Sequence, residues 1–407
     1  MPTDRLQAAL SRQLEDVDGR GTSKRHESVV TEVISPAGPL GARVLLAGHG
    51  HQHFLRMNSN SYLGLASHPA VVAAADEAVH AFGTGPGAVR FISGTYALHV
   101  ELERRLAEFH GREAAMVFSS AYGTVLGLLP ALVTPETALV SDALNHNCII
   151  NATKLAQPQT KVVYPHLDLE ALDRELTDLH DRCARVLVVT DGVFSMRGDH
   201  APLDRISALL AAHDGQFAEN AVLMVDDSHG VGALGATGRG TEEVTGTEAD
   251  VLVATLGKAL GVNGGYVVGS RTLVDHLRET APTYIYSNPI GPAEAAAATA
   301  ALEVLDSAEG TALLAQLRTT TARFRDGLAA LGFETIAGTH PVVPLLVRDT
   351  ARTAALVAHL RTHGVLATGL GYPVVPRGED EIRFQVSAAH TDADIDQVLQ
   401  VLQSFAD

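Results

Sequence analysis

The sequence has 407 residues, with 30 Lys and Arg against 47 Asp and Glu, so its formal net charge is −17. This negative charge argues against nucleic acid or an anionic membrane as the main partner, and two cysteines, Cys148 and Cys183, are too few for a disulfide framework or a cysteine-based metal site. No apolar run approaches the ~20 residues of a membrane-spanning helix and the N-terminus lacks the pattern of a signal peptide, so we expect a cytoplasmic protein without a bound metal.

Residues 1–57 read as an N-terminal segment ahead of the main domains. Leucines four residues apart predict an amphipathic helix over residues 5–17. Residues 44–47 and 53–57 predict two short strands of a hairpin. The histidines near its turn alternate along the chain, which is typical of a polar hairpin tip rather than of a metal site.

Residues 58–291 have the pattern of a large α/β domain. Short apolar strands mostly alternate with amphipathic helices, which predicts a doubly wound sheet with its binding site at the carboxyl ends of the strands. The expected strands cover residues 114–118, 138–141, 185–190, 221–225, 250–255 and 264–268, and the expected helices cover 69–82, 98–109, 169–182, 203–213 and 271–279.

Residues 292–407 predict a smaller C-terminal domain. An Ala-rich helix over 292–307 leads into it, and the elements that follow have an α+β order. The expected helices cover residues 316–330, 351–363 and the chain from 392 onward, and the expected strands cover 341–347 and 381–387.

One lysine stands where a buried strand ends. Residues 250–255 form this strand, Gly257 follows, and Lys258 comes next. Partial burial of an amine lowers its pKa, so the neutral form can attack a carbonyl carbon. A lone lysine in a loop is more often an exposed surface residue, and that alternative stays open for Lys258 considered by itself.

A carboxylate stands at the end of the strand before it. Asp226 follows strand 221–225, and the chain between it and Lys258 is long enough for a crossover to a neighbouring parallel strand. Pyridoxal phosphate needs such a pair: the amine carries the cofactor and the carboxylate keeps its ring nitrogen protonated. A helix N-cap or a metal ligand is the alternative role for Asp226 and for Asp227 beside it.

The motifs around these two residues resemble those of the α-oxoamine synthases. The strongest likeness lies in residues 225–232 (VDDSHGVG) and 255–261 (TLGKALG), and it extends from about residue 58 to residue 391, with further motifs at 141–146, 190–196, 284–288, 371–376 and 387–391. The family consists of pyridoxal phosphate-dependent transferases of aspartate-aminotransferase-like fold (fold type I), which condense an amino acid with an acyl-CoA. Within it, the chain most resembles the glycine C-acetyltransferases.

The resemblance implies a set of cofactor contacts. The backbone of Ala121 and Tyr122 would bind the cofactor phosphate, since a helix starts there and helix N-termini bind anions. The family usually has phenylalanine at the position of Tyr122, so the added hydroxyl needs a partner. His146 would stack on the cofactor ring, with a helix cap as its alternative role. Further contacts would come from Ser195, Thr255 and Lys258, from Asp226 at the ring nitrogen and from His229 at the phenolic oxygen.

Ser287 and Asn288 belong to a segment that reaches the cofactor phosphate of the neighbouring subunit in this family. The resemblance therefore implies a homodimer with shared active sites. Asn60 matches a residue that contacts the amino-acid substrate. Arg90 lies in a glycine-rich loop that shapes the same side of the pocket or a subunit interface.

Arg383 is implied as the ligand of the substrate carboxylate. It stands in a predicted strand in which Ile382 and Phe384 point the other way, so we expect its side chain to face the cleft between the domains. A surface salt bridge with Glu381 is its alternative role.

The implied reaction joins a small amino acid, glycine as the first choice, to a short acyl-CoA, acetyl-CoA as the first choice. It yields an α-amino-β-ketoacid or its decarboxylated aminoketone. Tyr122, Asn263 and Pro289 are among the residues that depart from the acetyltransferase pattern, so another amino acid, acyl group or carrier-protein thioester stays open. A pyridoxal phosphate-dependent aldolase or aminotransferase, or a non-catalytic cofactor-binding homologue, are alternatives from other classes.

Overall fold

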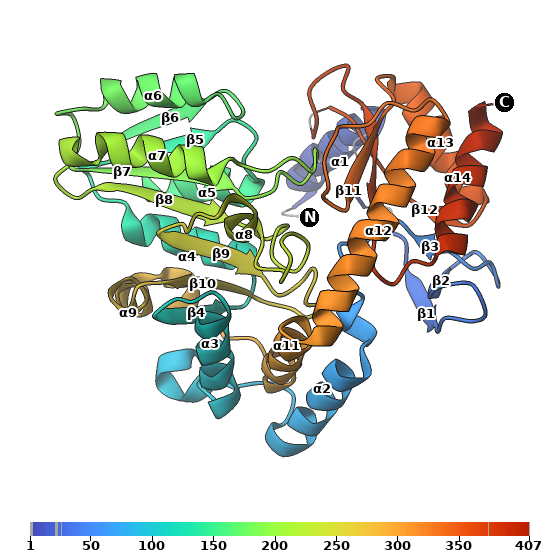
Figure 1. Ribbon diagram of the computed structural model, residues 1–407, viewed down its shortest axis with the longest axis horizontal. Helices are drawn as coiled ribbons and strands as arrows, with labels where there is room; N and C mark the ends of the chain where they lie inside the picture. The colour runs from blue at the N-terminus through green and yellow to red at the C-terminus, as the bar shows by residue number, and fades with distance from the viewer. Residues whose placement is uncertain (1–2, 21–22, 26, 373, 407) are drawn as a thin grey trace.

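A computed structural model describes residues 3–20, 23–25, 27–372 and 374–406. Figure 1 shows a large sheet at one side of the molecule and a smaller sheet at the other. The helices α11 (Pro292–Leu305) and α12 (Ala308–Ala330) lead from one to the other. No helix among the described residues is long and apolar enough to cross a membrane, and none of their His, Cys, Asp and Glu side chains form a group that could hold a metal ion.

The large sheet has seven strands in the order β4-β10-β9-β8-β7-β5-β6. Strands β6, β5, β7, β8 and β9 pair in parallel, whereas β10 is antiparallel to both β9 and β4. The predicted α/β fold with a doubly wound sheet is therefore confirmed. The strands are β4 (Ala114–Phe118), β5 (Thr137–Asp142), β6 (Thr160–Tyr164), β7 (Arg185–Asp191), β8 (Ala221–Asp226), β9 (Val251–Thr255) and β10 (Gly265–Gly269).

Two features of this sheet are missing from the sequence prediction. The first is the edge strand β6. Its side chains alternate between exposed and partly covered and include Thr160 and Lys161, so it lacks the continuous apolar run that marks the other strands. The reversed direction of β10 is the other. Only residues 256–264 separate β9 from β10, which is too short for the crossover that a parallel pair requires.

Helices cover both faces of the large sheet, so alternate residues of each strand enter two different cores. In β8, Leu223 and Val225 belong to one core and Met224 to the other. Burial on both faces explains why these strands are apolar at nearly every position. The surrounding helices are α2 (Pro69–Phe82), α3 (Ala97–Phe109), α4 (Ala121–Leu132), α5 (Asn147–Ala156), α6 (Leu169–Asp178), α7 (Leu203–His213), α8 (Thr241–Thr245), α9 (Arg271–Thr280) and α10 (Pro282–Ile285).

The small sheet has three antiparallel strands in the order β11-β14-β13, which are β11 (Val342–Leu346), β14 (Glu381–Gln385) and β13 (Thr368–Leu370). Helix α13 (Thr350–Thr362) packs on this sheet, and α14 (Asp392–Ala406) packs on α12 and α13. The α+β pattern predicted for this part of the chain is confirmed. Helix α12 begins earlier than the predicted residue 316, because Ser307 caps it by accepting from the backbone N–H of Glu309 and Gly310.

The N-terminal segment contains α1 (Asp4–Gly19), β1 (Val30–Ile34), β2 (Arg43–Leu46) and β3 (Leu55–Arg56). The predicted hairpin is wrong in part: β2 forms its ladder with β1, and its pairing with the second stretch is limited to the antiparallel bridge between Val44 and Phe54. Strand β3 instead pairs in parallel with β12 (Val365–Leu366). A buried ion pair of 2.6 Å between Arg43 and Asp394 also ties this segment to the C-terminal part.

Candidate active site

Polar residues that follow the strands of the large sheet line one pocket of about 260 Å³. They converge because the carboxyl ends of β4, β5, β7, β8 and β9 meet at the same edge of the sheet. The pocket is lined by Ser120, Ala121, Tyr122, His146, Cys148, Asp191, Val193, Ser195, Asp226, Ser228, His229, Thr255, Gly257, Lys258, Asn263 and Gly264. The sequence prediction placed eight of these residues in the site: Ala121, Tyr122, His146, Ser195, Asp226, His229, Thr255 and Lys258.

Lys258 lies in this pocket rather than on the surface. Burial lowers the pKa of its amine from the ordinary value, and the carboxylates of Asp226 and Asp191 oppose the shift without reversing it. A lowered pKa increases the fraction of neutral amine, which is the nucleophilic and basic form. The pocket therefore supplies an amine that can attack a carbonyl carbon or accept a proton.

Two buried carboxylates, Asp191 and Asp226, stand at the ends of the adjacent strands β7 and β8. Burial raises the pKa of Asp191 well above its usual range, and the charge of Asp226 acts in the same direction. One oxygen of Asp191 accepts from the backbone N–H of His146 at 3.0 Å, whereas Oδ1 is buried without a partner in the described part of the chain. Asp226 accepts from the backbone N–H of Ser228 at 3.1 Å.

Asp227, next to Asp226, has a structural role. Its two oxygens accept from the backbone N–H of Thr241 at 2.7 Å and from the Thr241 hydroxyl at 2.6 Å. These bonds fix the loop between β8 and α8 and use both oxygens of the carboxylate. Of the two neighbouring aspartates, only Asp226 faces the pocket.

His146 caps α5 and also lines the pocket, so the cap is confirmed and stacking on a cofactor ring stays a prediction. Its Nδ1 accepts from the backbone N–H of Cys148 at 3.3 Å, and burial lowers the pKa of the ring. The ring of Tyr122 meets it edge-to-face at 6.3 Å. The Tyr122 hydroxyl donates to Asn147 at 2.8 Å and accepts from Asn151 at 2.7 Å. The Tyr122 hydroxyl therefore finds its hydrogen-bond partners within the protein, in Asn147 and Asn151.

The start of α4 offers an anion site at the same pocket. Ser120 caps the helix by accepting from the N–H of Gly123 at 2.9 Å, which leaves the N–H groups of Ala121 and Tyr122 in the first, unpaired turn. Gly265 of β10 runs close beneath: a Cβ on it would lie 2.1 Å from the nitrogen of Ala121. Only glycine allows this approach of sheet and helix.

Ser287 and Asn288 do not line this pocket in a single chain. They follow α10, where Asn288 is exposed, and the Ser287 hydroxyl donates to the carbonyl of Asn288 at 3.4 Å. Their predicted contact with a second subunit therefore requires another copy of the chain and stays a prediction.

Arg383, on the small sheet, does not line the pocket of a single chain but contacts Ser195, which does. Its neighbours Ile382 and Phe384 are fully buried on the opposite face of β14, as the alternation predicts. Its Nη1 donates to the backbone carbonyl of Ser195 at 3.1 Å, and burial lowers the pKa of the guanidinium. No ion pair joins it to Glu381 in the described ranges, so the salt-bridge alternative is wrong.

Asn60 lies beside this arginine strand. Its side-chain amide lies 2.9 Å from that of Gln385, and Gln385 is two residues beyond Arg383 on the same face of β14. With its amide turned so that both groups are satisfied, the Gln385 oxygen accepts from Nε and Nη2 of Arg383 at 3.2 and 3.0 Å. Sequence reasoning missed Gln385, although its period-two spacing from Arg383 is a signal that could have found it.

Tyr62 and His340 surround His229. The Tyr62 hydroxyl lies 2.7 Å from His229 Nδ1, and His340 Nε2 donates to the carbonyl of His229 at 2.9 Å. Burial lowers the pKa of His229 well below its usual range, so the ring is neutral and carries one N–H. When the tyrosine donates to Nδ1, that proton sits on Nε2. Tyr62 could have been found from its place two residues after Asn60, whereas no local pattern marks His340.

Arg90 is a correction to the predicted site. Its guanidinium donates to both oxygens of Glu103 at 3.0 and 3.2 Å and to the Thr95 hydroxyl at 2.9 Å, and the side chain is only 3% exposed. Arg278 donates to the same carboxylate at 2.8 Å. Arg90 does not line the pocket, and its charge is compensated within the chain, so we assign it to packing.

Comparisons with known proteins agree on one family. The model for class I and II aminotransferases matches residues 52–402. The 8-amino-7-oxononanoate synthase of Geobacter metallireducens is 41% identical over 402 residues, which covers 98% of each chain. The mitochondrial 2-amino-3-ketobutyrate coenzyme A ligase of Mus musculus is 39% identical over 398 residues, covering 97% of this chain and 91% of that one.

A solved structure adds a similar fold with a ligand. It is a lysine-to-alanine variant of serine palmitoyltransferase from S. paucimobilis with bound pyridoxal phosphate and myriocin. It is 28% identical, with a TM-score of 0.86 that covers 99% of this chain and 97% of that chain.

The residues of the pocket fit pyridoxal phosphate. Lys258 offers an amine of lowered pKa, the pair of Asp191 and Asp226 offers carboxylate oxygens, one of them unpartnered, and the start of α4 offers N–H groups to a phosphate. The neighbouring pocket of about 310 Å³ has neither a lysine nor an aspartate among its lining residues. With 41% identity along nearly its whole length to one such enzyme, the chain belongs to the α-oxoamine synthases, pyridoxal phosphate-dependent enzymes of fold type I.

Proposed function

We propose that the protein condenses a small amino acid, glycine in the first place, with a short acyl-CoA, acetyl-CoA in the first place. The product is an α-amino-β-ketoacid, or its aminoketone after loss of carbon dioxide, and CoA is released. The observation that carries the proposal is the position of Lys258 and Asp226 in one pocket, with Arg383 bonded to the carbonyl of Ser195 at its edge. The charges of Asp226 and Arg383 both act on the amine of Lys258. The mouse relative named for 2-amino-3-ketobutyrate supports this choice of substrates.

Specific residues would hold the cofactor. Lys258 would carry the cofactor, and Asp226 would face its ring nitrogen. His146 would lie against the cofactor ring, and His229 would face its phenolic oxygen. Ser195 and Thr255 would complete the contacts, and the N–H groups of Ala121 and Tyr122 would bind its phosphate. When bound, the cofactor supplies a conjugated ring that can accept an electron pair from the α-carbon of an amino acid.

Arg383 binds and orients the amino acid in this proposal. Its planar guanidinium can donate two parallel hydrogen bonds to a carboxylate, and the carbonyl of Ser195 already fixes the direction of Nη1. Asn60, held by Gln385, lies next to it and adds a second polar contact. The oxygens that accept from Arg383 among the described residues belong to the neutral groups of Ser195 and Gln385, so its charge stays uncompensated and would attract a substrate carboxylate.

Lys258 also acts on protons. Once its amine is released by the incoming amino acid, it can remove the α-proton, because burial lowers its pKa and so increases the fraction of neutral, basic amine. A carbon–carbon bond then forms between the α-carbon and the acyl carbonyl carbon, and the carbon–sulfur bond of the thioester breaks. The electron pair leaves with the CoA sulfur, which ends as a thiol.

We propose a homodimer with shared active sites. Ser287 and Asn288 are outside the pocket of their own chain and accessible, as residues that contact a neighbour's phosphate must be. Mixing Lys258→Ala chains with chains carrying Ser287→Ala and Asn288→Ala tests this point. If the segment crosses, both lesions fall in one site of the mixed dimer and the other site regains activity. If no mixture regains activity, sharing is wrong.

A second candidate is another α-oxoamine synthase of a biosynthetic pathway, with a different amino acid or a longer acyl thioester, including one on a carrier protein. The 41% identity to an 8-amino-7-oxononanoate synthase favours it. Amino acids crossed with acyl-CoAs of two to eight carbons, read by release of free thiol, separate the two. We expect glycine with acetyl-CoA to have the highest kcat/KM. A higher value for a longer acyl group would select the second candidate, and turnover of amino acid without any thiol would indicate an aldolase or aminotransferase.

A further inference from the structure

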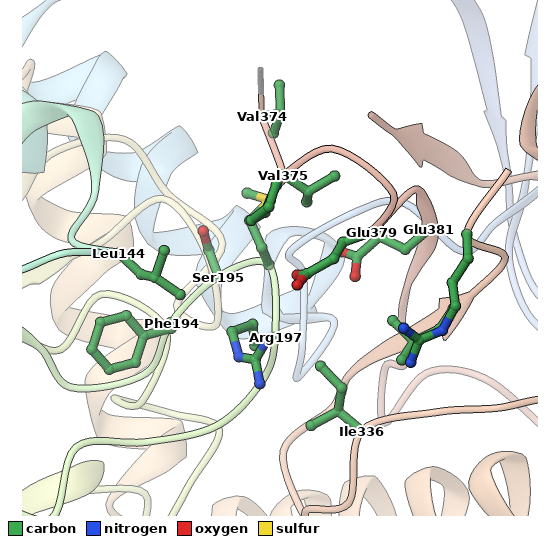
Figure 2. A pocket seen from close by; sticks show the side chains of 13 residues that line it. Leu144, Phe194, Ser195, Arg197, Ile336, Val374, Val375, Glu379 and Glu381 are labelled. Carbon is green, nitrogen blue, oxygen red and sulfur yellow. The ribbon is translucent and has the colours of Figure 1, made fainter. Parts of the chain in front are cut away.

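The loop of residues 192–202, called the β7–α7 loop, joins the catalytic pocket to the arginine proposed to bind the substrate carboxylate. Its Ser195 lines the pocket, and the Ser195 carbonyl accepts from Nη1 of Arg383 at 3.1 Å. The sulfur of Met196 lies 3.8 Å from the same nitrogen. Figure 2 shows Ser195 and Arg197 of this loop among the residues around the neighbouring pocket of about 310 Å³. The orientation of Arg383 therefore depends on where this loop is held.

His166 connects the β7–α7 loop to the end of β5. Its Nδ1 lies 3.0 Å from an oxygen of Asp142, the last residue of β5, and its Nε2 lies 3.2 Å from an oxygen of Asp199 in the loop. The ring also meets Phe194, the residue before Ser195, edge-to-face at 4.4 Å. An ionised carboxylate can only accept a hydrogen bond, so a ring that serves both carboxylates carries a proton on each nitrogen. The geometry thus requires the imidazolium form of His166.

The charges around His166 favour this protonated form. Burial by itself would lower the pKa of the ring from its ordinary value of 6.5, whereas Asp142 and Asp199 raise it to about 9. The effect is reciprocal, because His166 and Arg197 lower the pKa of Asp199 against the effect of burial. The hydroxyl of Tyr164, at the end of β6, has a pKa raised by burial and by Asp142, so it stays neutral in this pH range. The other titratable residues close to His166 along these elements are Lys161, Asp168 and His200.

Asp142 is itself held in place by the backbone around it. Its Oδ1 also accepts from the N–H of Leu144 at 2.8 Å, and its Oδ2 accepts from the N–H of Leu167 at 2.9 Å. Leu167 has a φ of 54°, in the left-handed region that is uncommon for residues other than glycine. Such a conformation persists only where the surrounding contacts fix it. Asp142 is therefore a fixed point, and His166 links Asp199 and its loop to it.

We propose that protonated His166 is a positioning residue for amino-acid binding, because it holds the β7–α7 loop where the Ser195 carbonyl orients Arg383. The proposal rests on the role of Arg383 proposed above. A neutral imidazole has one N–H and can serve only one of the two carboxylates. Since the pKa of His166 is raised above its ordinary value, the link is complete below pH 6.5 and is lost as the pH rises through about 9. Amino-acid binding should weaken in the same range.

The test measures the Kd of glycine for the holoenzyme by calorimetry, in wild type and in His166→Gln, at a series of pH values. Glutamine carries no charge at any pH, so at about pH 7 the variant should bind glycine roughly fivefold more weakly, the contribution of about one hydrogen bond. The ratio of the two Kd values should fall to about one above about pH 10, where wild type has lost the same charge, with its midpoint near pH 9. The ratio isolates His166, because the amino groups of glycine and Lys258 are common to both proteins.

His213→Gln is the matched control. His213 is another well-covered histidine that pairs with a carboxylate, that of Asp173 at 2.8 Å, but it is the last residue of α7 and lies outside the β7–α7 loop. Its replacement should leave the Kd of glycine unchanged at every pH. Asp199→Asn keeps an acceptor oxygen but removes one charge, so it should move the weakening of glycine binding down to about pH 8 or below. A ratio for His166→Gln that stays at one, or that stays constant across the pH range, would overturn the proposal.

Two measurements without substrate separate failure of this proposal from failure of the proposed function. In ¹⁵N NMR of labelled histidine, the signal that His166→Gln removes should titrate near pH 9 in the wild-type holoenzyme. In hydrogen exchange, peptides that cover residues 192–202 should exchange faster in His166→Gln than in wild type at the same pH. If glycine binds at no pH, the proposed function fails, while both measurements still test the link.

If glycine binds but His166 titrates near its ordinary pKa of 6.5, the proposal for His166 alone fails. Should His166→Gln not fold, the wild-type titration, assigned by the signal that Asp199→Asn shifts, and the Kd profile of Asp199→Asn decide the point. A glycine Kd profile of Asp199→Asn that matches wild type would then overturn the proposal.

Discussion

Two regions of the molecule hold an arginine that is buried or partly buried, and they use it differently. In the packing region, made of Arg90, Thr95, Glu103 and Arg278, a carboxylate faces the guanidinium at 3.0 Å. In the pocket region, Arg383 donates to a backbone carbonyl, and no carboxylate pairs with it among the described residues. Charge compensation, rather than burial, therefore distinguishes an arginine that stabilises the fold from one that can receive a substrate anion.

The comparison is sharpest for Lys258, which should matter to catalysis and not to folding. Lys258→Ala should lower condensation by at least about 10³-fold, because it removes both the cofactor attachment and a general base. Unfolding in urea should be unchanged or shifted to higher denaturant, since an unfavourably buried amine is removed. Lys161→Ala on the exposed edge strand β6 is the control, and it should change neither the condensation activity nor the unfolding in urea. Thiol release and urea unfolding are measured on the same preparations. A Lys258→Ala enzyme that kept a tenth of the wild-type activity would contradict this role.

The packing region should respond in the opposite way. Arg90→Leu should lower the free energy of unfolding by about 3 kcal/mol, the lower end for a broken buried ion pair, because Arg278 still compensates Glu103. The KM for glycine should stay the same in the protein that folds. Arg104→Leu breaks an exposed pair with Glu101 and should cost about 1 kcal/mol or less. A raised KM for glycine with normal stability would return Arg90 to the substrate site.

Arg383→Lys tests the other arginine of the comparison. Lysine keeps the charge but cannot donate two parallel hydrogen bonds, so the KM for glycine should rise roughly tenfold, equivalent to ~1.5 kcal/mol. The melting temperature should barely change. An unchanged KM together with a lower melting temperature would make Arg383 a packing residue like Arg90.

Which residues of the site can be predicted from the sequence depends on how far apart along the chain their contacts lie. The strand-end residues Tyr122, His146, Asp226 and Lys258 were predictable, because parallel strands carry whatever follows them to one edge. The face of Arg383 was predictable from alternation with buried Ile382 and Phe384.

Other parts of the site depend on contacts between distant elements, which no local pattern encodes. Arg90 was misassigned because its partner Glu103 lies on helix α3, outside the glycine-rich loop that holds Arg90. The residues of that loop give no sign of this ion pair. The contact of His340 with the carbonyl of His229 joins residues from the two parts of the chain. Pairing of β3 with β12 is similar, because it joins strands from opposite ends of the chain. The reversal of β10 is different, since the short connection of residues 256–264 could have predicted it.

The smallest effect is expected from Tyr62, which positions His229. Tyr62→Phe removes the hydroxyl that lies 2.7 Å from Nδ1 and should lower kcat about fivefold, equivalent to ~1 kcal/mol. The tautomer of His229 should also become mixed, which ¹⁵N NMR of labelled histidine detects. Normal kcat with an unchanged tautomer would show that Tyr62 only fills space.

The central claim is that Lys258 and Arg383 together hold an amino acid and remove its α-proton. The most direct test is exchange of the glycine α-proton in D₂O, followed by NMR without any acyl donor. We predict exchange by the wild-type holoenzyme, exchange with a higher glycine KM in Arg383→Lys, and none above background in Lys258→Ala. Exchange at the wild-type rate in Lys258→Ala would contradict the claim.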